Sequence, residues 1–109
     1  MRRKNVDSFV RLYMVSGLQH CFGGRGPDSF GEVYALKFDD PQHSVDASLE
    51  QWMEKTTAPS IIIASKFEGQ DQTHAKMTRP LCPYPQAAKY RGSGDPNDAA
   101  NFECERPKK

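Results

Sequence analysis

The sequence has 109 residues, of which 15 are basic and 14 acidic, so its formal net charge is +1. A chain of this length forms one domain with a modest core, and its near-neutral charge gives no sign of a nucleic-acid-binding or membrane-binding surface. Only 37% of the residues are hydrophobic, and no run of them approaches the roughly 20 residues of a transmembrane helix. The first four residues, MRRK, are basic, but the run after them is too short and too polar for the apolar core of a secretory signal peptide.

The first apolar stretch is FVRLYMV, residues 9–15, in which a single arginine interrupts a hydrophobic run. Such a run is typical of a buried strand in a parallel sheet. A Ser-Gly pair ends the stretch, and His20 and Cys21 come next before the chain turns away through GGRGP, residues 23–27. Because open α/β sheets build their sites beyond the carboxyl ends of their strands, His20 is a candidate general base.

His20 has two interpretations on the sequence alone. A lone histidine is more often structural than catalytic, but this one comes after a buried-type strand, lies in a glycine-rich turn and precedes a cysteine. A general base has to be held in place, since a displacement of about 1 Å can cost on the order of 10²-fold in rate. The other histidines, His43 and His74, lie in a helix start and a polar linker and are expected to be solvated.

Residues 28–40 have aromatic side chains without a clean period and are expected to form a surface loop. A helix is predicted over residues 41–55, with Asp40 as its N-cap and Pro41 in its first turn. Its apolar residues recur at helical spacing and predict one apolar face: Val45, Leu49, Trp52 and Met53. Thr56 stands where glycine is the preferred C-cap, so the helix end is expected to be strained.

Residues 60–67, SIIIASKF, are β-branched and predict a second strand. A polar linker, 68–76, leads to a shorter apolar run, 77–81. Together these segments predict a β-hairpin whose proline is confined to the edge. The segment 82–104 has few core residues and is expected to be a loop, and residues 105–109 are expected to be disordered.

The three cysteines make an odd count. Cys82 and Cys104 bracket a segment rich in proline, glycine and tyrosine, and a disulfide between them is worth on the order of 3 kcal/mol. Cys21 is then left over, which suggests a partner elsewhere or a free thiol. Three reduced cysteines in a cytosolic protein remain the alternative, and no cysteine or histidine spacing matches a zinc site.

Several segments match a known functional motif only in part. GGRGP lacks the residue order of a phosphate-binding loop and precedes no immediate helix. Residues 95–103 superficially resemble a calcium loop, but Ala99 and Ala100 stand where an oxygen ligand and a glycine are required. No cofactor is therefore expected in this chain. No Gly-x-Ser-x-Gly occurs, and Gly92-Ser93-Gly94 lacks its spacing.

A catalytic triad is also incomplete here. In α/β-hydrolases the nucleophile and the acid precede the histidine in the chain. Only Asp7, Ser8 and Ser16 precede His20, and all lie in or beside the same strand. They cannot fold back onto their own loop, so the nucleophile and the acid are expected outside this chain.

Four segments stand out together: RLYMVSGLQHC, GGRGPD, LEQWMEK with APSIIIASKF, and TRPLCPYPQAAKYRGSGDPNDAANFEC. In this order they resemble the C-terminal end of the tannase and feruloyl esterase family, from Val6 to Cys104. The resemblance implies a secreted or periplasmic α/β-hydrolase that cleaves small phenolic esters, such as galloyl or feruloyl esters. It implies a serine nucleophile, His20 as general base and an acid that orients the imidazole. Calcium, where the family binds it, belongs to a lid domain outside this chain.

The resemblance also implies roles for the cysteines. The family joins the cysteine after the catalytic histidine to a cysteine before the nucleophile, so Cys21 is expected to bridge to a cysteine outside this chain. Cys82 and Cys104 match a disulfide-bonded pair in the family's tail. The sequence departs from the family where proline is usual, at Ser16 and Arg25.

We therefore predict an α/β protein in which residues 1–109 form the C-terminal portion of one α/β-hydrolase domain. Its parts are the last core strand, the histidine loop, an amphipathic helix, a β-hairpin and a disulfide-bonded tail. The chain alone is expected to be inactive as a carboxylic-ester hydrolase, without nucleic-acid or membrane partners. The alternatives are a non-catalytic truncated remnant and a small disulfide-stapled binding module; the unpaired Cys21 and the buried-type first strand argue against the module.

Overall fold

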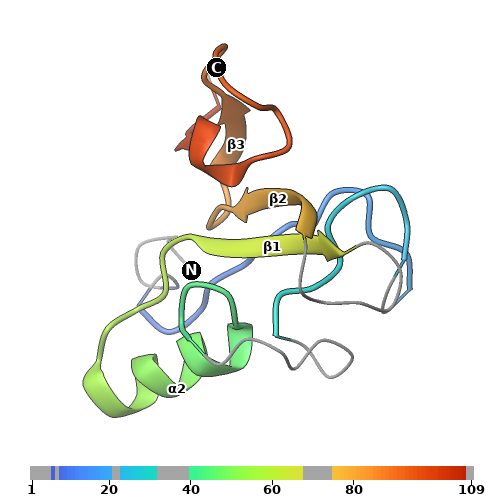
Figure 1. Ribbon diagram of the computed structural model, residues 1–109. Helices are drawn as coiled ribbons and strands as arrows, with labels where there is room; N and C mark the ends of the chain where they lie inside the picture. The colour runs from blue at the N-terminus through green and yellow to red at the C-terminus, as the bar shows by residue number, and fades with distance from the viewer. Residues whose placement is uncertain (1–5, 7, 21–22, 32–39, 68–74, 108–109) are drawn as a thin grey trace.

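The computed structural model of this chain describes residues 6, 8–20, 23–31, 40–67 and 75–107. In these residues helix α2 (Val45–Lys55) precedes strands β1 (Ile62–Phe67), β2 (Ala75–Leu81), β3 (Ala87–Tyr90) and β4 (Phe102–Glu105), with a short 3-10 helix η1 (Ala99–Asn101) before β4. Figure 1 shows β1 and β2 at the centre, α2 on one side of them, and the β3 region with the C-terminus on the other. The expected mixture of helix and strand is present, but both sheets in the described residues are antiparallel pairs.

The β1–β2 hairpin confirms the prediction made from the β-branched run. The two strands pair antiparallel from Ile62 opposite Leu81 to Phe67 opposite Ala75. β2 begins at Ala75, inside the segment expected to be linker, and residues 68–74 lie outside the described part of the chain. Pro80 lies opposite Ile63, in a two-stranded sheet where a residue without an N–H group is tolerated.

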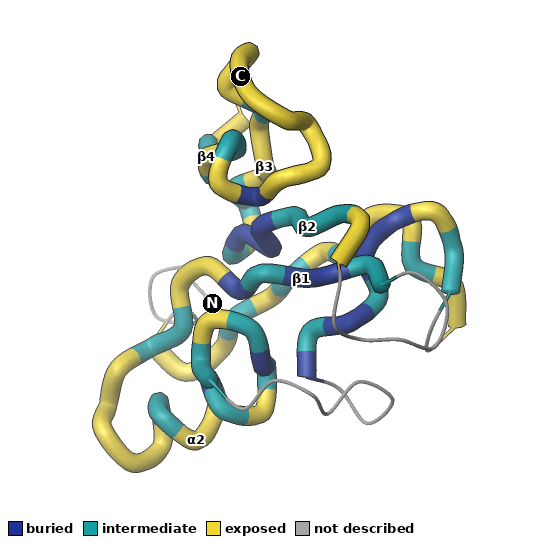
Figure 2. Tube along the Cα trace, viewed as in Figure 1, coloured by how far each residue is buried: buried dark blue, intermediate teal, exposed yellow. Residues whose placement is uncertain are grey.

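The core of the described chain is small. Ile62, Ala64 and Leu81 are buried on one face of the hairpin, in agreement with the alternation of side chains along a strand. Partly buried side chains from other segments pack against them: Tyr13, Val15, Phe30 and Val45. Figure 2 shows the buried positions concentrated along β1 and β2 and the tail largely exposed.

Residues 9–15 do not form the predicted buried parallel strand. The segment is extended and antiparallel to residues 83–84, through a bridge between Tyr13 and Pro83 and a 2.7 Å hydrogen bond from the Tyr84 N–H to the Leu12 carbonyl. The Tyr13 side chain packs on the core, whereas Leu12 is 50% exposed and Met14 is 65% exposed. The period-two alternation of a strand is thus retained, but no strand in the described residues covers its outer face.

Tyr13 fixes this segment to the start of the hairpin. Its hydroxyl donates a 2.6 Å hydrogen bond to the Ser60 carbonyl. Burial raises the pKa of the Tyr13 phenol, and the nearby Arg11 opposes the shift. Residues 9–15 are therefore positioned by the inward-facing Tyr13 side chain and by the backbone hydrogen bond between Leu12 and Tyr84.

Helix α2 begins at Val45, and the prediction of Asp40 as N-cap is wrong. The cap is Ser44, whose Oγ accepts a 3.2 Å hydrogen bond from the Ala47 N–H. Asp40 instead begins a turn, in which its carbonyl accepts a 3.1 Å bond from the His43 N–H. Serine and aspartate are comparable N-caps, so tertiary contact decides between them: the Val45 N–H donates to the Phe30 carbonyl at 2.8 Å.

The predicted apolar face of α2 is only partly used. Val45 packs against the core and Trp52 is half-buried, with the Arg11 guanidinium 5.3 Å from its ring centre. Leu49 is 52% exposed and Met53 is 76% exposed. The first turn of the helix contacts the core and Arg11 lies over Trp52, whereas no described segment covers Leu49 and Met53.

The C-terminus of α2 has the strain that the sequence indicates. Thr56 adopts left-handed backbone angles, φ 54° and ψ 22°, a conformation that is unfavourable for a residue with a β-carbon. We expect Thr56→Gly to stabilise the chain by about 1 kcal/mol, measured by urea unfolding. Thr57→Gly is the matched control, because Thr57 is not left-handed and its hydroxyl, like that of Thr56, donates to the Lys55 carbonyl. Equal destabilisation by both variants would show that the Thr56 conformation costs nothing.

The expectation of an irregular loop over residues 82–104 is wrong. β3 and β4 form a second antiparallel hairpin, with Ala88 opposite Cys104, and Glu105 belongs to β4 rather than to a disordered end. A disulfide joins Cys82 to Cys104, whose Cα atoms are 5.7 Å apart. This is the pair expected from the resemblance.

The tail is also attached to β2. The Ala99 N–H donates to the Thr78 hydroxyl at 2.8 Å, and the Thr78 N–H donates to the Asn97 carbonyl at 2.9 Å. The Arg79 guanidinium lies 4.7 Å from the ring centre of Phe102. The second hairpin is thus held on the first by contacts from one strand as well as by the disulfide.

Candidate functional site

The candidate site is the loop that carries His20. Leu18 and Gly24 form an antiparallel bridge at its base, and the Gln19 N–H donates a 3.1 Å hydrogen bond to the Gly23 carbonyl. His20 is therefore the first residue of a tight turn whose two arms are held by backbone atoms, and its side chain is exposed. Cys21, expected to form a disulfide outside this chain, lies outside the described residues.

Three glycines, Gly17, Gly24 and Gly26, allow the arms of this loop to approach each other, and a β-carbon on Gly17 would collide with the Gly26 backbone. A β-carbon on Gly24 would collide with the Gly17 carbonyl oxygen, and one on Gly26 would collide with the Ser16 carbonyl oxygen. The Gly26 N–H donates to the Gly17 carbonyl at 3.1 Å. This bond holds the two arms of the loop together where they approach most closely. The GGRGP segment is thus the return arm of a closed turn, in agreement with the turn interpretation.

Asp28 and Lys66 attach this return arm to the end of β1. Asp28 Oδ2 accepts a 2.8 Å hydrogen bond from the Gly23 N–H. Lys66 Nζ donates to the Gly24 carbonyl at 3.0 Å and lies 3.3 Å from Asp28 Oδ2. The side chains of Lys66 and Asp28 are only 17% and 19% exposed, so the pair is largely shielded from water.

Ser29 extends this attachment along β1. The Ser29 N–H donates to the Ser65 carbonyl at 2.9 Å, and the Ser65 N–H donates to the Ser29 carbonyl at 2.8 Å. Both serines are buried. The expectation of a surface loop is wrong for Ser29, because this residue is buried and forms an isolated antiparallel bridge with Ser65 of β1.

Sequence reasoning missed Asp28 and Lys66 as parts of the site. One signal was present: Lys66 is the only charged residue in the strand SIIIASKF, and Asp28 comes directly after GGRGP. The sequence alone does not show that Asp28 and Lys66 are in contact, because 38 positions separate them. Only the folded structure brings the two side chains together.

The remaining predicted residues lie elsewhere. Cys82 comes after Leu81, which pairs with the first residue of β1, whereas the His20 loop is attached at the other end of that strand. His43 is half-buried, and its Nδ1 is 2.9 Å from Asp40 Oδ2. Burial opposes ionisation of Asp40, but hydrogen bonds and the nearby imidazole outweigh it and lower the pKa of that carboxyl. His74 lies outside the described residues.

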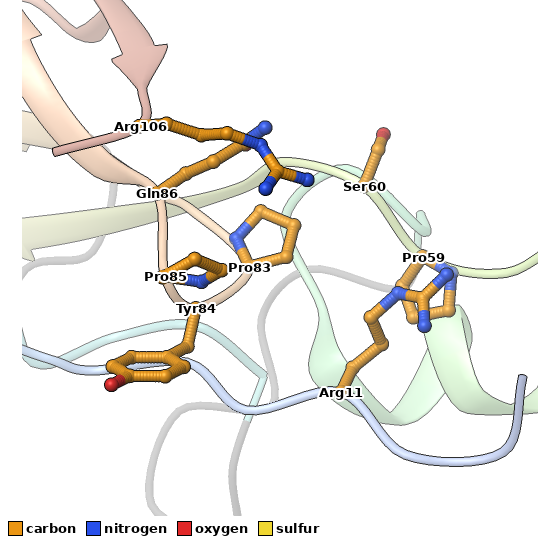
Figure 3. Close-up of a pocket in the computed structure, with 8 residues that line it drawn as sticks. All are labelled: Arg11, Pro59, Ser60, Pro83, Tyr84, Pro85, Gln86 and Arg106. Atoms are coloured by element: carbon orange, nitrogen blue, oxygen red, sulfur yellow. The ribbon is translucent and has the colours of Figure 1, made fainter. Parts of the chain in front are cut away.

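A pocket of about 280 Å³ lies at the start of β1, away from the residues that attach the His20 loop. Figure 3 shows the side chains of Arg11 and Arg106 on two sides of it, with Tyr84 and neighbouring prolines between them. Ser60 also lines it. None of the residues predicted for catalysis lines this pocket.

Within the described ranges, no group of three or more histidine, cysteine, aspartate and glutamate side chains is placed to hold a metal ion. Asp95 and Asp98, in the segment that resembles a calcium loop, accept hydrogen bonds from the N–H groups of Asn97 and Ala100 instead. No described helix is long and apolar enough to cross a bilayer.

Comparison with known proteins gives consistent matches. A family model described as "Tannase and feruloyl esterase" matches residues 1–105. An uncharacterized esterase of Xanthomonas campestris pv. campestris is 45% identical over 103 residues, which cover 91% of this chain and 18% of that protein. The mono(2-hydroxyethyl) terephthalate hydrolase of Piscinibacter sakaiensis is 41% identical over 99 residues, which cover 91% of this chain and 14% of that enzyme.

A solved structure agrees with these matches. The crystal structure of feruloyl esterase B from Aspergillus oryzae superposes with a TM-score of 0.81 and 30% identity, over 94% of this chain and 20% of that one. The chain thus spans a fifth or less of the length of these proteins.

Proposed function

Because this chain belongs to the tannase and feruloyl esterase family, we propose that it is part of a carboxylic-ester hydrolase in which His20 is the general base. The observation that carries the proposal is the family match over residues 1–105, which includes the whole His20 loop. Two similar proteins are named for action on esters of aromatic acids. The proposed substrates are therefore small phenolic esters, with galloyl and feruloyl esters as the first candidates.

The proposed reaction uses His20 as a proton carrier. A serine hydroxyl from outside this chain attacks the ester carbonyl carbon while the imidazole accepts the hydroxyl proton. The imidazole then returns that proton to the departing alcohol as the ester C–O bond breaks. Water, activated by the same imidazole, releases the acid from the serine. An aspartate from outside this chain orients the ring. The exposed position of His20 on a closed turn supports this role.

We further propose that these residues are the C-terminal portion of an α/β-hydrolase domain and that the enzyme is secreted or periplasmic. The coverage of a fifth or less of each similar protein supports the first part. The disulfide between Cys82 and Cys104 supports the second, since such bonds form and persist mainly in oxidising compartments. Cys21 is proposed to bridge to the cysteine that precedes the nucleophile.

The proposal is tested by comparing the 109-residue chain with the product of an extended reading frame. The DNA upstream of Met1 is searched for an in-frame Gly-x-Cys-Ser segment and an intervening aspartate, and both proteins are assayed on methyl gallate, methyl ferulate and p-nitrophenyl acetate. We expect turnover by the longer protein and none by the 109-residue chain above its His20→Ala variant. A reading frame without the serine segment would favour a non-catalytic remnant, and turnover by the short chain would contradict the assignment of the nucleophile.

A further inference from the structure

The strongest unexplained feature is the shielded ion pair below the His20 loop. A lysine in a mostly hydrophobic strand loses hydration when the strand packs, and an ion pair that is largely removed from water contributes little net stability or even costs some. Lys66 and Asp28 nevertheless occupy such a position, at 17% and 19% exposure. Their contacts explain why: together they make three hydrogen bonds or ion contacts with each other and the return arm of the loop.

We propose that Asp28 and Lys66 are positioning residues for the general base, and that they fix where the His20 turn lies relative to β1. This inference rests on the proposed role of His20. Neither residue is proposed to touch the substrate. Their effect passes through Gly23 and Gly24, the two backbone units that close the turn on the side opposite His20.

The geometry supports action at two successive peptide units. Gly23 is held from both sides, since its carbonyl accepts from the Gln19 N–H and its own N–H donates to Asp28. The Gly24 carbonyl accepts from Lys66, and Gly24 forms the bridge with Leu18 at the base of the turn. A shift of Asp28 or Lys66 is therefore transmitted to the arm from which His20 projects.

A charged pair is suited to this task because glycines supply no side chains of their own. The return arm contains Gly23, Gly24 and Gly26, and glycine leaves the backbone free to occupy many conformations. The close approach of the arms requires glycine at Gly24 and Gly26, so packing of side chains cannot hold this arm. Charge-assisted hydrogen bonds to backbone atoms can, since they are shorter and stronger than neutral ones.

The test measures local opening of the turn in the 109-residue chain by amide hydrogen exchange. Lys66→Met keeps an unbranched side chain that is one atom shorter and removes its donors. We expect it to accelerate exchange at the Gly23 and Gly26 amides by about tenfold or more, with no change at the Thr78 amide of β2. Lys66→Arg retains a charged donor and is expected to restore most of the protection.

Two further variants make the result specific. Asp28→Asn keeps an oxygen that can accept from Gly23 but removes the charge opposite Lys66, and a smaller acceleration is expected. Lys89→Met is the matched control, because Lys89 pairs with Glu105 at 3.4 Å on the exposed tail and should leave the turn unchanged. The His20 ring protons, recorded in the same samples, should broaden or shift in Lys66→Met and return toward the unmodified signals in Lys66→Arg.

The outcomes separate this inference from the proposed function. Unprotected Gly23 and Gly26 amides in the unmodified chain would overturn it, as would unchanged protection in Lys66→Met. Equal acceleration at Thr78 would also overturn it, since the pair would then stabilise the fold in general. If the turn responds as expected but His20→Ala leaves the longer enzyme active, the positioning of the turn stands and the role of His20 fails.

Discussion

In the proposed longer esterase, His20→Ala is expected to lower kcat by a factor on the order of 10³ or more, while the protein remains folded. The loss is large because the His20 imidazole is the proposed acceptor of the serine proton. Folding should survive because the turn is closed by backbone hydrogen bonds, from Gln19 to Gly23 and from Gly26 to Gly17. The measurements are kcat on methyl ferulate and the thermal unfolding midpoint.

The matched control for this experiment is His43→Ala. His43 is half-buried beside Asp40, ahead of α2, and is not assigned to the reaction. Its replacement should leave kcat near the unmodified value and change only stability. A His20→Ala enzyme with a near-normal rate, or a His43→Ala enzyme as impaired as His20→Ala, would remove His20 from the mechanism.

Removal of the disulfide is expected to have the second largest effect, on stability. Replacing both Cys82 and Cys104 by serine should lower the free energy of unfolding by on the order of 3 kcal/mol, since 22 residues separate the two cysteines. Besides the disulfide, the second hairpin is held only by its contacts with Thr78 and Arg79 of β2 among the described residues, and β3 is largely exposed. Urea unfolding of the oxidised and double-serine chains measures the difference.

Cys21→Ser is the control for the disulfide, because Cys21 is expected to be free in this chain. It should leave the unfolding curve unchanged. Non-reducing peptide mapping identifies the bonded pair directly. A peptide that links Cys21 to Cys82 or to Cys104 would contradict both the stabilising role of the tail disulfide and the proposed partner of Cys21.

The first hairpin and the helix could be predicted because their signals are local. The β-branched run before Lys66 specifies β1, and helical spacing of apolar residues specifies most of α2. The start of that helix could not be placed because Ser44 and Asp40 are both good caps, and the contact of Val45 with Phe30 selects the later one. Sequence pattern ranks caps by chemistry and carries no information on distant contacts.

The second hairpin could not be predicted, for a related reason. AAKY has no alternation of apolar and polar residues, and FECE alternates over only four residues, which is the lower limit for a strand pattern. Their pairing depends on the Cys82–Cys104 disulfide and on contacts with β2. Similarly, His20 could be singled out from the sequence, whereas its attachment through Asp28 and Lys66 depends on residues brought together by the fold.

The pairing of residues 9–15 with residues 83–84 has a consequence for synthesis of the protein. The Leu12 carbonyl receives its hydrogen bond from Tyr84, which the ribosome adds roughly 70 residues later, or about 4–14 s at typical elongation rates. During that interval the inward-facing side chains of Tyr13 and Val15 lack the β1–β2 core on which they pack in the folded chain. Nascent chains shorter than Tyr84 should therefore bind chaperones through this segment, and the binding should weaken once Tyr84 has left the exit tunnel.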